Sequence, residues 1–459
     1  MSGALAALLD CALQSLKQPV ESTDGERQTG AELLALAARV ERALVAQGVA
    51  RAEPVLLRMG NRPCDIGALL GLWRAGAVVV PLHVDAAPAT YDRLRGQTGA
   101  RFSVDGDRLD TIGSTPPPAR PLLRDAALVM FTSGSTGLPK GAVVGHQRLA
   151  DKLVVLDRLL GFAGDTVLLQ LQLTFIFGLW VSLLALMKGA RVILVPKFSN
   201  EAMARGLAQA TILGGVPSMF RALLMEAPPP APRLRKLLTG GEVLPPQIAR
   251  RLLDYTQADI HDLFGLTETG TCDFHCGPAD QPQGFGTIGR ATERVAYRIA
   301  ASGELQIRSP FGMLGYLDDP ALTAASFEDG YFKTGDLARV DERGLVALIG
   351  RAKEIVSRGG IKIAPLEVDH LLAEHPDVAA ALCAGVPDER LGEVIHAVVV
   401  PRAGAALDVA RLRDWLLTRT ERYKVPEVFY IHDALPSGST GKADRRAVAR
   451  LAQAQADAG

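Results

Sequence analysis

The chain has 459 residues, of which 48% are hydrophobic, and this is enough for two or more buried cores. Lysine plus arginine and aspartate plus glutamate each number 50, so the formal net charge is zero. This balance argues against a basic surface that recruits nucleic acid. The sequence also contains no block of like charges.

Cysteine usage and the N-terminus predict a soluble, cytoplasmic protein. Five scattered cysteines, an odd number, are typical of a reducing compartment. Residues 1–20 lack the basic start, apolar centre and cleavage site of a secretory signal. The most apolar run, Leu173–Met187, is shorter than the roughly 18 residues of a membrane-spanning helix. We therefore expect a buried helix there and no membrane insertion.

Strand and helix patterns alternate along the first half of the chain. The predicted helices are Leu5–Leu16, Leu33–Val45, Asp65–Ala75, Arg148–Leu160, Gly178–Met187 and Ser218–Met225. The predicted strands are Val55–Leu57, Ala77–Pro81, Ala127–Phe131, Thr166–Leu171, Arg191–Val195 and Ile212–Gly214. Proline-rich segments at Thr115–Pro121 and Ala227–Pro232 are expected to be loops. The alternation predicts an α/β fold with largely parallel sheets flanked by helices.

The stretch Leu128–Gly141 combines an apolar strand with a glycine-rich loop. Glycines let backbone N–H groups converge on an anion, and hydroxyls and a lysine add donors for phosphate oxygens. The position of Lys140 between Pro139 and Gly141 excludes the loop of P-loop enzymes. A flexible Gly/Ser linker is the alternative. The candidate phosphate ligands are Thr132, Ser133, Gly134, Ser135, Thr136, Gly137 and Lys140.

This stretch resembles the phosphate-binding signature of the acyl-adenylate-forming superfamily, which includes acyl-CoA synthetases, nonribosomal peptide adenylation domains and luciferases. The resemblance implies that the segment around Phe175, Phe177 and Gly178 lines an acid pocket, together with Gly240. Many CoA ligases place His at the position of Phe175. Amino-acid adenylation domains place Asp at the position of Ile176. Because a buried ammonium without a counter-charge is costly, the resemblance argues against an α-amino acid substrate.

Two further motifs follow in the order of that family: Thr239–Glu242, and His261–Gly270 with the sequence HDLFGLTETG. The second offers an aromatic face, hydroxyls and a carboxylate, which suits adenine stacking and Mg²⁺ on nucleotide phosphates. Asp262 stands where many relatives carry Asn or Gln against the adenine amino group. The resemblance implies nucleotide contacts from Gly241, Glu242, Asp262, Phe264 and Gly265, a catalytic role for Thr267, and catalysis and Mg²⁺ binding by Glu268.

Cys272, His275 and Cys276 have spacings that approach those of a metal site. Structural zinc needs four ligands, and no fourth lies nearby in the sequence. Ordinary loop residues are the other interpretation.

After a β-rich stretch (Val295–Ile299, Glu304–Arg308), the resemblance implies ribose binding by Asp336 and Arg351, with a hinge at Lys353. It therefore divides the chain into residues 1–350, which bind AMP and acid, and a small mobile α+β domain, residues 351–459. In the small domain we expect a helix starting near Ala364–Val368, strands at Val378–Val386 and Val394–Val400, and a helix at Val409–Leu417. The resemblance places Arg358, Gly359 and Gly360 near the thiol acceptor, and makes Lys442 the catalytic lysine.

The resulting hypothesis is an AMP-forming ligase of an apolar or aromatic small-molecule carboxylic acid, using ATP, Mg²⁺ and CoA. The phosphopantetheine of an acyl carrier protein is the alternative acceptor. A non-catalytic nucleotide-binding protein is an alternative of another class, and luciferase-type oxygenation also stays open.

Overall fold

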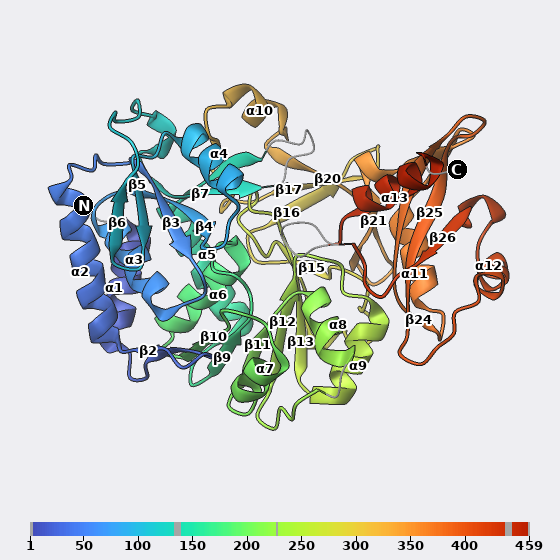
Figure 1. Cartoon of the computed structure of the whole chain (residues 1–459), viewed down its shortest axis with the longest axis horizontal. Coiled ribbons are helices and arrows are strands. Elements are labelled where there is room, and N and C mark those ends of the chain that lie inside the picture. The colour runs from blue at the N-terminus through green and yellow to red at the C-terminus, as the bar shows by residue number, and fades with distance from the viewer. Residues whose placement is uncertain (1–2, 133–138, 226–227, 437–442, 458–459) are drawn as a thin grey trace.

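The structure, a computed structural model, describes residues 3–132, 139–225, 228–436 and 443–457. Within these residues it is an α/β protein with four sheets, which confirms the predicted fold class (Figure 1).

A nine-stranded sheet lies at the centre of the larger lobe, in the order β15-β14-β13-β12-β11-β9-β10-β1-β2. Its central strands, β13 to β1 in this order, are parallel, and both edges are antiparallel. The strands are β1 (Val20–Ser22), β2 (Arg27–Gln28), β9 (Thr166–Leu169), β10 (Arg191–Leu194), β11 (Ile212–Gly214), β12 (Lys236–Gly240), β13 (Asp259–Phe264), β14 (Phe274–Cys276) and β15 (Arg290–Ala291).

A second sheet of the larger lobe has seven strands in the order β18-β8-β7-β4-β3-β5-β6. They are β3 (Pro54–Met59), β4 (Val78–His83), β5 (Phe102–Asp105), β6 (Arg108–Thr111), β7 (Ala126–Thr132), β8 (Lys140–Gly145) and β18 (Gly315–Tyr316). The strands β5, β3, β4 and β7 are parallel, whereas β8 returns antiparallel to β7.

The main core lies between these two sheets because alternate strand residues point to opposite faces. Leu169 packs in this core, whereas its neighbour Leu168 packs in a second core on the other face of the nine-stranded sheet. Helices α1, α2, α3, α5 and α6 contribute to the first core, and α7, α8 and α9 to the second. The helices of this lobe are α1 (Ala4–Ser15), α2 (Gly30–Ala46), α3 (Pro63–Arg74), α4 (Pro88–Thr98), α5 (His146–Leu160), α6 (Ile176–Met187), α7 (Asn200–Leu207), α8 (Pro217–Met225), α9 (Pro246–Thr256) and α10 (Pro320–Ala325).

A five-stranded antiparallel sheet follows in sequence and carries Asp336 and Arg351 on paired strands. Its strands are β16 (Ala296–Ile299), β17 (Glu304–Arg308), β19 (Phe327–Glu328), β20 (Tyr331–Val340) and β21 (Val346–Arg351).

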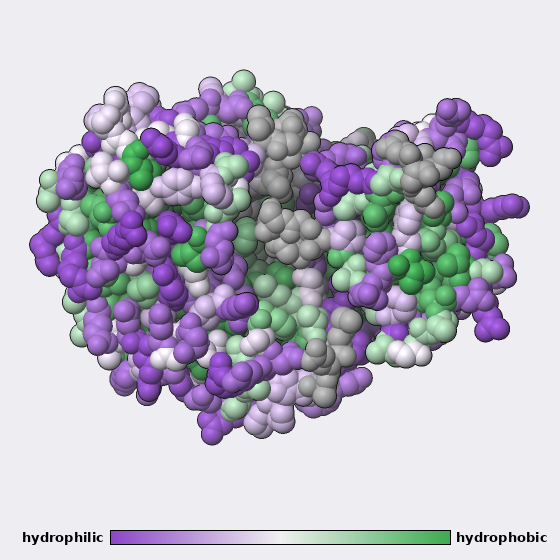
Figure 2. Space-filling model, in the orientation of Figure 1, coloured by the Kyte–Doolittle hydropathy of each residue, from purple (hydrophilic) through white to green (hydrophobic). Residues whose placement is uncertain are grey.

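The remaining elements form the smaller lobe at the right of Figure 1, with a core of its own. It contains the short helix η3 (Ala352–Glu354), helices α11 (Pro365–Ala373), α12 (Val409–Leu417) and α13 (Arg445–Asp457), and strands β22 (Val356–Arg358), β23 (Ile361–Ile363), β24 (Val378–Asp388), β25 (Gly392–Pro401) and β26 (Val428–Ile431). Hydrophilic side chains are spread widely over the face shown in Figure 2, consistent with the balanced charge. The domain boundary at 350/351 stays a prediction.

Most predicted elements are confirmed within a few residues, including the buried helix α6 in Leu173–Met187. Among the described residues, no helix has the length and apolar character needed to cross a membrane. The β1–β2 hairpin interrupts the apolar helical pattern of the first 50 residues. It was not predicted, because its strands are too short to show a recognisable alternation of apolar and polar residues.

Candidate functional site

Three distant parts of the chain meet at the side chain of Glu268. Thr132, the last residue of β7, donates from Oγ1 to Glu268 Oε1 at 3.0 Å. Tyr316 on β18 donates its hydroxyl to the same oxygen at 3.2 Å. Lys140, the first residue of β8, places its Nζ 5.7 Å from the centroid of the Tyr316 ring. The structure thus gathers one carboxylate, two hydroxyls and one ammonium.

The β7–β8 hairpin explains how Thr132 and Lys140 come together, because these two residues are register partners. The predicted phosphate ligands between them, Ser133, Gly134, Ser135, Thr136 and Gly137, lie outside the described residues, as does Lys442. Tyr316 was not among the predicted site residues, since no local motif distinguishes it from the other tyrosines.

The ends of β12 and β13 bring the predicted adenine-binding residues side by side. Thr239 and Asp262 are register partners, so Gly240–Glu242 lies beside Leu263–Gly265. Gly241 adopts a left-handed conformation (φ 80°), which favours glycine. The Phe264 ring packs edge-on against Phe274, with ring centroids 6.0 Å apart.

Two carboxyl groups in this region have different environments. Burial raises the pKa of Asp262 to about 8, so its carboxyl is largely protonated near pH 7. A neutral carboxyl can donate and accept hydrogen bonds, as the amide of Asn does. Glu242 instead accepts a hydrogen bond from Ser218 Oγ at 3.1 Å.

Asp336 and Arg351, the residues predicted to bind ribose, lie together. They are register partners on β20 and β21, and Arg351 Nε donates to Asp336 Oδ1 at 2.9 Å. Asp336 is 3% exposed, and its second oxygen, Oδ2, is buried without a hydrogen-bond partner in the described parts of the chain. Burial raises the pKa of Asp336, although the Arg351 charge opposes this. A buried acceptor of this kind fits a hydroxyl ligand.

The residues predicted to line the acid pocket lie at the start of α6 and at the end of β12. Phe177 stacks on the buried Trp180, with centroids 5.6 Å apart. A Cβ on Gly240 would lie 3.4 Å from the Phe177 ring and 2.2 Å from Leu263 O, so only glycine fits there. Gly178, the third residue of α6, follows Phe177 directly. Phe175 is the N-cap residue of α6 and is 42% exposed.

A buried charged network lies directly behind the Glu268 segment. Lys152 on α5 is fully buried, and its Nζ donates to Cys272 O at 2.8 Å and to Thr292 Oγ1 at 3.2 Å. Asp273 is also fully buried and accepts a hydrogen bond from the hydroxyl of Thr269, the residue after Glu268. Burial raises the pKa of Asp273 to about 7, against the opposing effect of the Lys152 charge. The position of Lys152 on the apolar face of a predicted helix was the signal that could have revealed it.

The residues considered for zinc have separate contacts. His275 Nε2 lies 3.0 Å from His261 Nδ1, and the two rings are stacked. The Cys276 thiol donates to Gly284 O at 3.4 Å, and Cys272 is buried in the main core. Within the described residues, no three His, Cys, Asp or Glu side chains form a group that could hold a metal ion.

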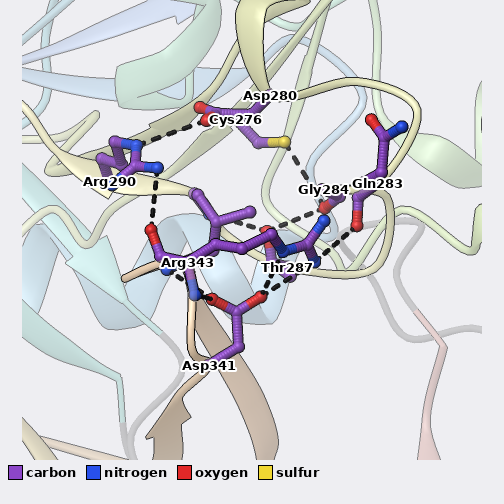
Figure 3. Close-up of polar contacts among 10 residues, drawn as sticks. Cys276, Asp280, Gln283, Gly284, Thr287, Arg290, Asp341 and Arg343 are labelled. Carbon is purple, nitrogen blue, oxygen red and sulfur yellow. Dashed lines mark hydrogen bonds and ion pairs between the residues drawn. The ribbon is translucent and has the colours of Figure 1, made fainter.

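A polar network ties the loop after β14 to the β20–β21 turn (Figure 3). Arg343 donates to Gln283 O at 2.8 Å and pairs with Asp341 at 2.8 Å. Arg290 donates to Arg343 O at 2.9 Å and pairs with Asp280 at 3.3 Å. The network thus joins the loop after β14, the antiparallel partner of β13, to the turn after β20, the strand that carries Asp336.

In the smaller lobe, the predicted hinge residue Lys353 lies in η3, directly after β21. Gly359 and Gly360 form the turn between β22 and β23, next to the predicted acceptor residue Arg358. Arg358 donates to Tyr423 O at 2.8 Å and pairs with Glu427, so its guanidinium is held within this lobe. Arg445, at the start of α13, pairs with Asp369 and, at 3.1 Å, with Glu354 of η3.

Known proteins resemble the chain over almost its full length. The family model described as AMP-binding enzyme matches residues 11–112 and 101–317, and the model described as AMP-binding enzyme C-terminal domain matches residues 367–442. A feruloyl-CoA synthase from an Amycolatopsis species is 33% identical, covering 91% of this chain and 92% of the relative. An indoleacetate–CoA ligase from Aromatoleum aromaticum is 31% identical, covering 92% of each chain. The crystal structure of ATP-bound MatB from Rhodopseudomonas palustris superposes with a TM-score of 0.87 at 26% identity, covering 98% of this chain and 99% of MatB.

Proposed function

This chain belongs to the AMP-binding enzyme family, and we propose on that premise that it is an AMP-forming acid–CoA ligase. The names of two relatives at 31–33% identity over nine-tenths of both chains, a feruloyl-CoA synthase and an indoleacetate–CoA ligase, support this activity. The observation that carries the proposal is the meeting of Thr132, Lys140 and Glu268 from segments far apart in the sequence.

The proposed first step joins the acid to AMP. A carboxylate oxygen of the acid attacks the α-phosphorus of ATP, and the bond to the departing pyrophosphate breaks. Charge develops on phosphate oxygens in this step, and donors fixed in advance stabilise it. Lys140 forms no ion pair within the described residues, so its ammonium is available to these oxygens, and Thr132 offers a hydroxyl. We assign the segment Ser133–Gly137 to the same phosphates by resemblance.

Glu268 Oε2 accepts no hydrogen bond in the described parts of the chain, and this free carboxylate oxygen fits one ligand position on Mg²⁺. A bound Mg²⁺ would offset the charge of the phosphates. Thr267 precedes Glu268 and is assigned to the same catalytic segment.

Adenine and ribose have separate proposed ligands. Adenine would lie between Phe264 and the Gly241–Glu242 turn, with its amino group near Asp262. Asp336 Oδ2 would accept from a ribose hydroxyl, because it is buried and without another partner among the described residues. Arg351 orients this carboxylate through the opposite oxygen.

The acid we propose is apolar or aromatic, because Phe177, which stacks on Trp180 and lies beside Gly240, would offer it an aromatic face. In the second step the CoA thiol would attack the acyl carbon of the mixed anhydride and release AMP. The acceptor residues would be Arg358–Gly360, reached by rotation of residues 351–459 about Lys353. Five free cysteines are compatible with the cytoplasmic location that we also propose.

The test is an acid panel assayed for pyrophosphate release from ATP and Mg²⁺, then repeated with CoA and with a holo carrier protein. We expect acid-dependent pyrophosphate, and a thioester with CoA. ADP and phosphate as products would exclude the proposed reaction. If a thioester forms only with the carrier protein, the acceptor is phosphopantetheine and not CoA.

A further inference from the structure

The hydrogen bonds to Glu268 are unequally distributed between its two carboxylate oxygens. Thr132 and Tyr316 both donate to Oε1, at 3.0 and 3.2 Å. For Oε2, the described part of the chain provides no donor. Two donors on one oxygen fix the plane of the carboxylate and leave the other oxygen for a different ligand.

Tyr316 is well placed to hold Glu268 because the tyrosine itself is rigid. It pairs with Ala142 of β8 through β18, and only 5% of it is exposed. Its ring packs in a small core with Met313 and Phe332. Burial, with a further contribution from the Glu268 charge, raises the pKa of the Tyr316 hydroxyl. Tyr316 is therefore a firmly held hydrogen-bond donor to Glu268.

The ring of Tyr316 also separates two opposite charges. Lys140 Nζ lies 5.7 Å from the ring centroid, an arrangement in which a cation is attracted by the aromatic face. No ion pair joins Lys140 to Glu268 among the described residues. Both charges are thus kept for ligands: the ammonium for an anion, and the carboxylate for a cation.

We propose that Tyr316 is a positioning residue for the divalent cation that accompanies the nucleotide. Its hydroxyl holds Glu268 Oε1 so that Oε2 is presented to the cation. The inference rests on the proposed function, since that function supplies the metal–nucleotide complex. Hydrogen-bond partners of this kind commonly change metal affinity by about 10–100-fold when they are removed.

The variant Tyr316→Phe tests the proposal because it removes the hydroxyl and keeps the ring beneath Lys140. The probe is Mn²⁺ with an ATP analogue that carries a methylene bridge between the α- and β-phosphates. Free and bound Mn²⁺ are separated by electron paramagnetic resonance, so no turnover is needed. We expect Mn²⁺ to bind about 10–100-fold more weakly to the variant than to the wild type.

Tyr331→Phe is the matched control. Tyr331 also lies in the larger lobe, and its ring contacts Arg298 and Arg308 at 4.7 and 4.8 Å. Its hydroxyl forms no hydrogen bond within the described residues, so its loss should leave Mn²⁺ affinity unchanged. Thermal unfolding of both variants shows whether each remains folded.

A Glu268→Gln background distinguishes a positioning role of Tyr316 from a general disturbance of the site. If Tyr316 acts through Glu268, Tyr316→Phe should have no further effect on Mn²⁺ affinity in a Glu268→Gln protein. Wild-type Mn²⁺ affinity in Tyr316→Phe would overturn the proposal, and so would an equal loss in the two backgrounds. Should the wild type bind Mn²⁺ with the analogue but release no pyrophosphate with any acid, the proposed function would fail while the role of Tyr316 stands.

Discussion

Replacing Lys152 by Met tests whether the Lys152 ammonium stabilises the ionised form of Asp273 in the buried network next to the Glu268 segment. Met preserves the length of the side chain and removes the ammonium. The variant loses the hydrogen bonds to Cys272 O and Thr292 Oγ1, and Asp273 loses the nearby positive charge. The free energy of unfolding should therefore fall by one amount that is constant with pH and by another that depends on the charge of Asp273.

The constant component is the loss of hydrogen bonds from a charged donor, about 1.5–3 kcal/mol. The second component follows from the Asp273 pKa of about 7, which is raised above the value of about 3.9 in an unfolded chain. A raised carboxyl pKa contributes stability that is complete at low pH and is lost as pH rises through the folded-state value. Without Lys152 the folded-state pKa rises further, so the variant loses additional stability above pH 7. At about 1.4 kcal/mol per pH unit above pH 7, the extra loss of unfolding free energy at pH 8.5 relative to pH 5.5 is at most about 2 kcal/mol.

The measurement is urea unfolding of the full chain, followed by circular dichroism at pH 5.5 and pH 8.5. Lys236→Met is the matched control, because Lys236 also donates to two carbonyl oxygens, Leu160 O and Gly161 O, at 2.6 Å, and lies 4.0 Å from the carboxylate of Asp165. Its cost should be similar at both pH values. The pH-dependent part should vanish when Lys152→Met is combined with Asp273→Asn. A cost for Lys152→Met that is equal at both pH values would refute the electrostatic account.

Three further predictions concern catalysis. Lys442→Ala should lower adenylate formation by about 10²–10³-fold, because one ammonium that bridges two anions is lost, and should spare thioester formation from synthetic acyl-adenylate; normal pyrophosphate release would remove Lys442 from the mechanism. Lys353→Pro fixes φ at the proposed hinge and should impair the thiol step far more than adenylation, so equal losses in the two half-reactions would count against a hinge there. Asp336→Asn should weaken AMP binding in calorimetry by about 10-fold and leave the affinity for 2′,3′-dideoxy-AMP unchanged, because only AMP has ribose hydroxyls to offer; an equal loss for both nucleotides would contradict ribose recognition by Asp336.

Local patterns predicted the elements that depend on nearby residues. The family resemblance assigned Asp336 and Arg351 to one site, and they are register partners on adjoining strands. The strand before the glycine-rich loop and the helix α6 were predicted because each is a continuous apolar segment with a clear end. The functional roles of the residues on these elements were implied by the family resemblance and not by geometry.

Contacts between distant segments could not be predicted in the same way. Tyr316 lies 48 residues from Glu268, and only the pairing of β18 with β8 brings its hydroxyl to the carboxylate. The raised pKa of Asp262 also depends on burial, which is set by the whole fold.

Strand β18 is synthesised long after its partner β8, and this affects the chain while it is still on the ribosome. Strand β8 ends at Gly145, but its outer partner begins only at Gly315, so the growing sheet keeps an open edge while the intervening residues are made. At translation rates of about 5–20 residues per second, this interval lasts roughly 10–30 s. An unpaired edge is a template for association between chains. Expression fragments that stop before Gly315 would keep that edge permanently, so a soluble fragment of this lobe should extend beyond Tyr316.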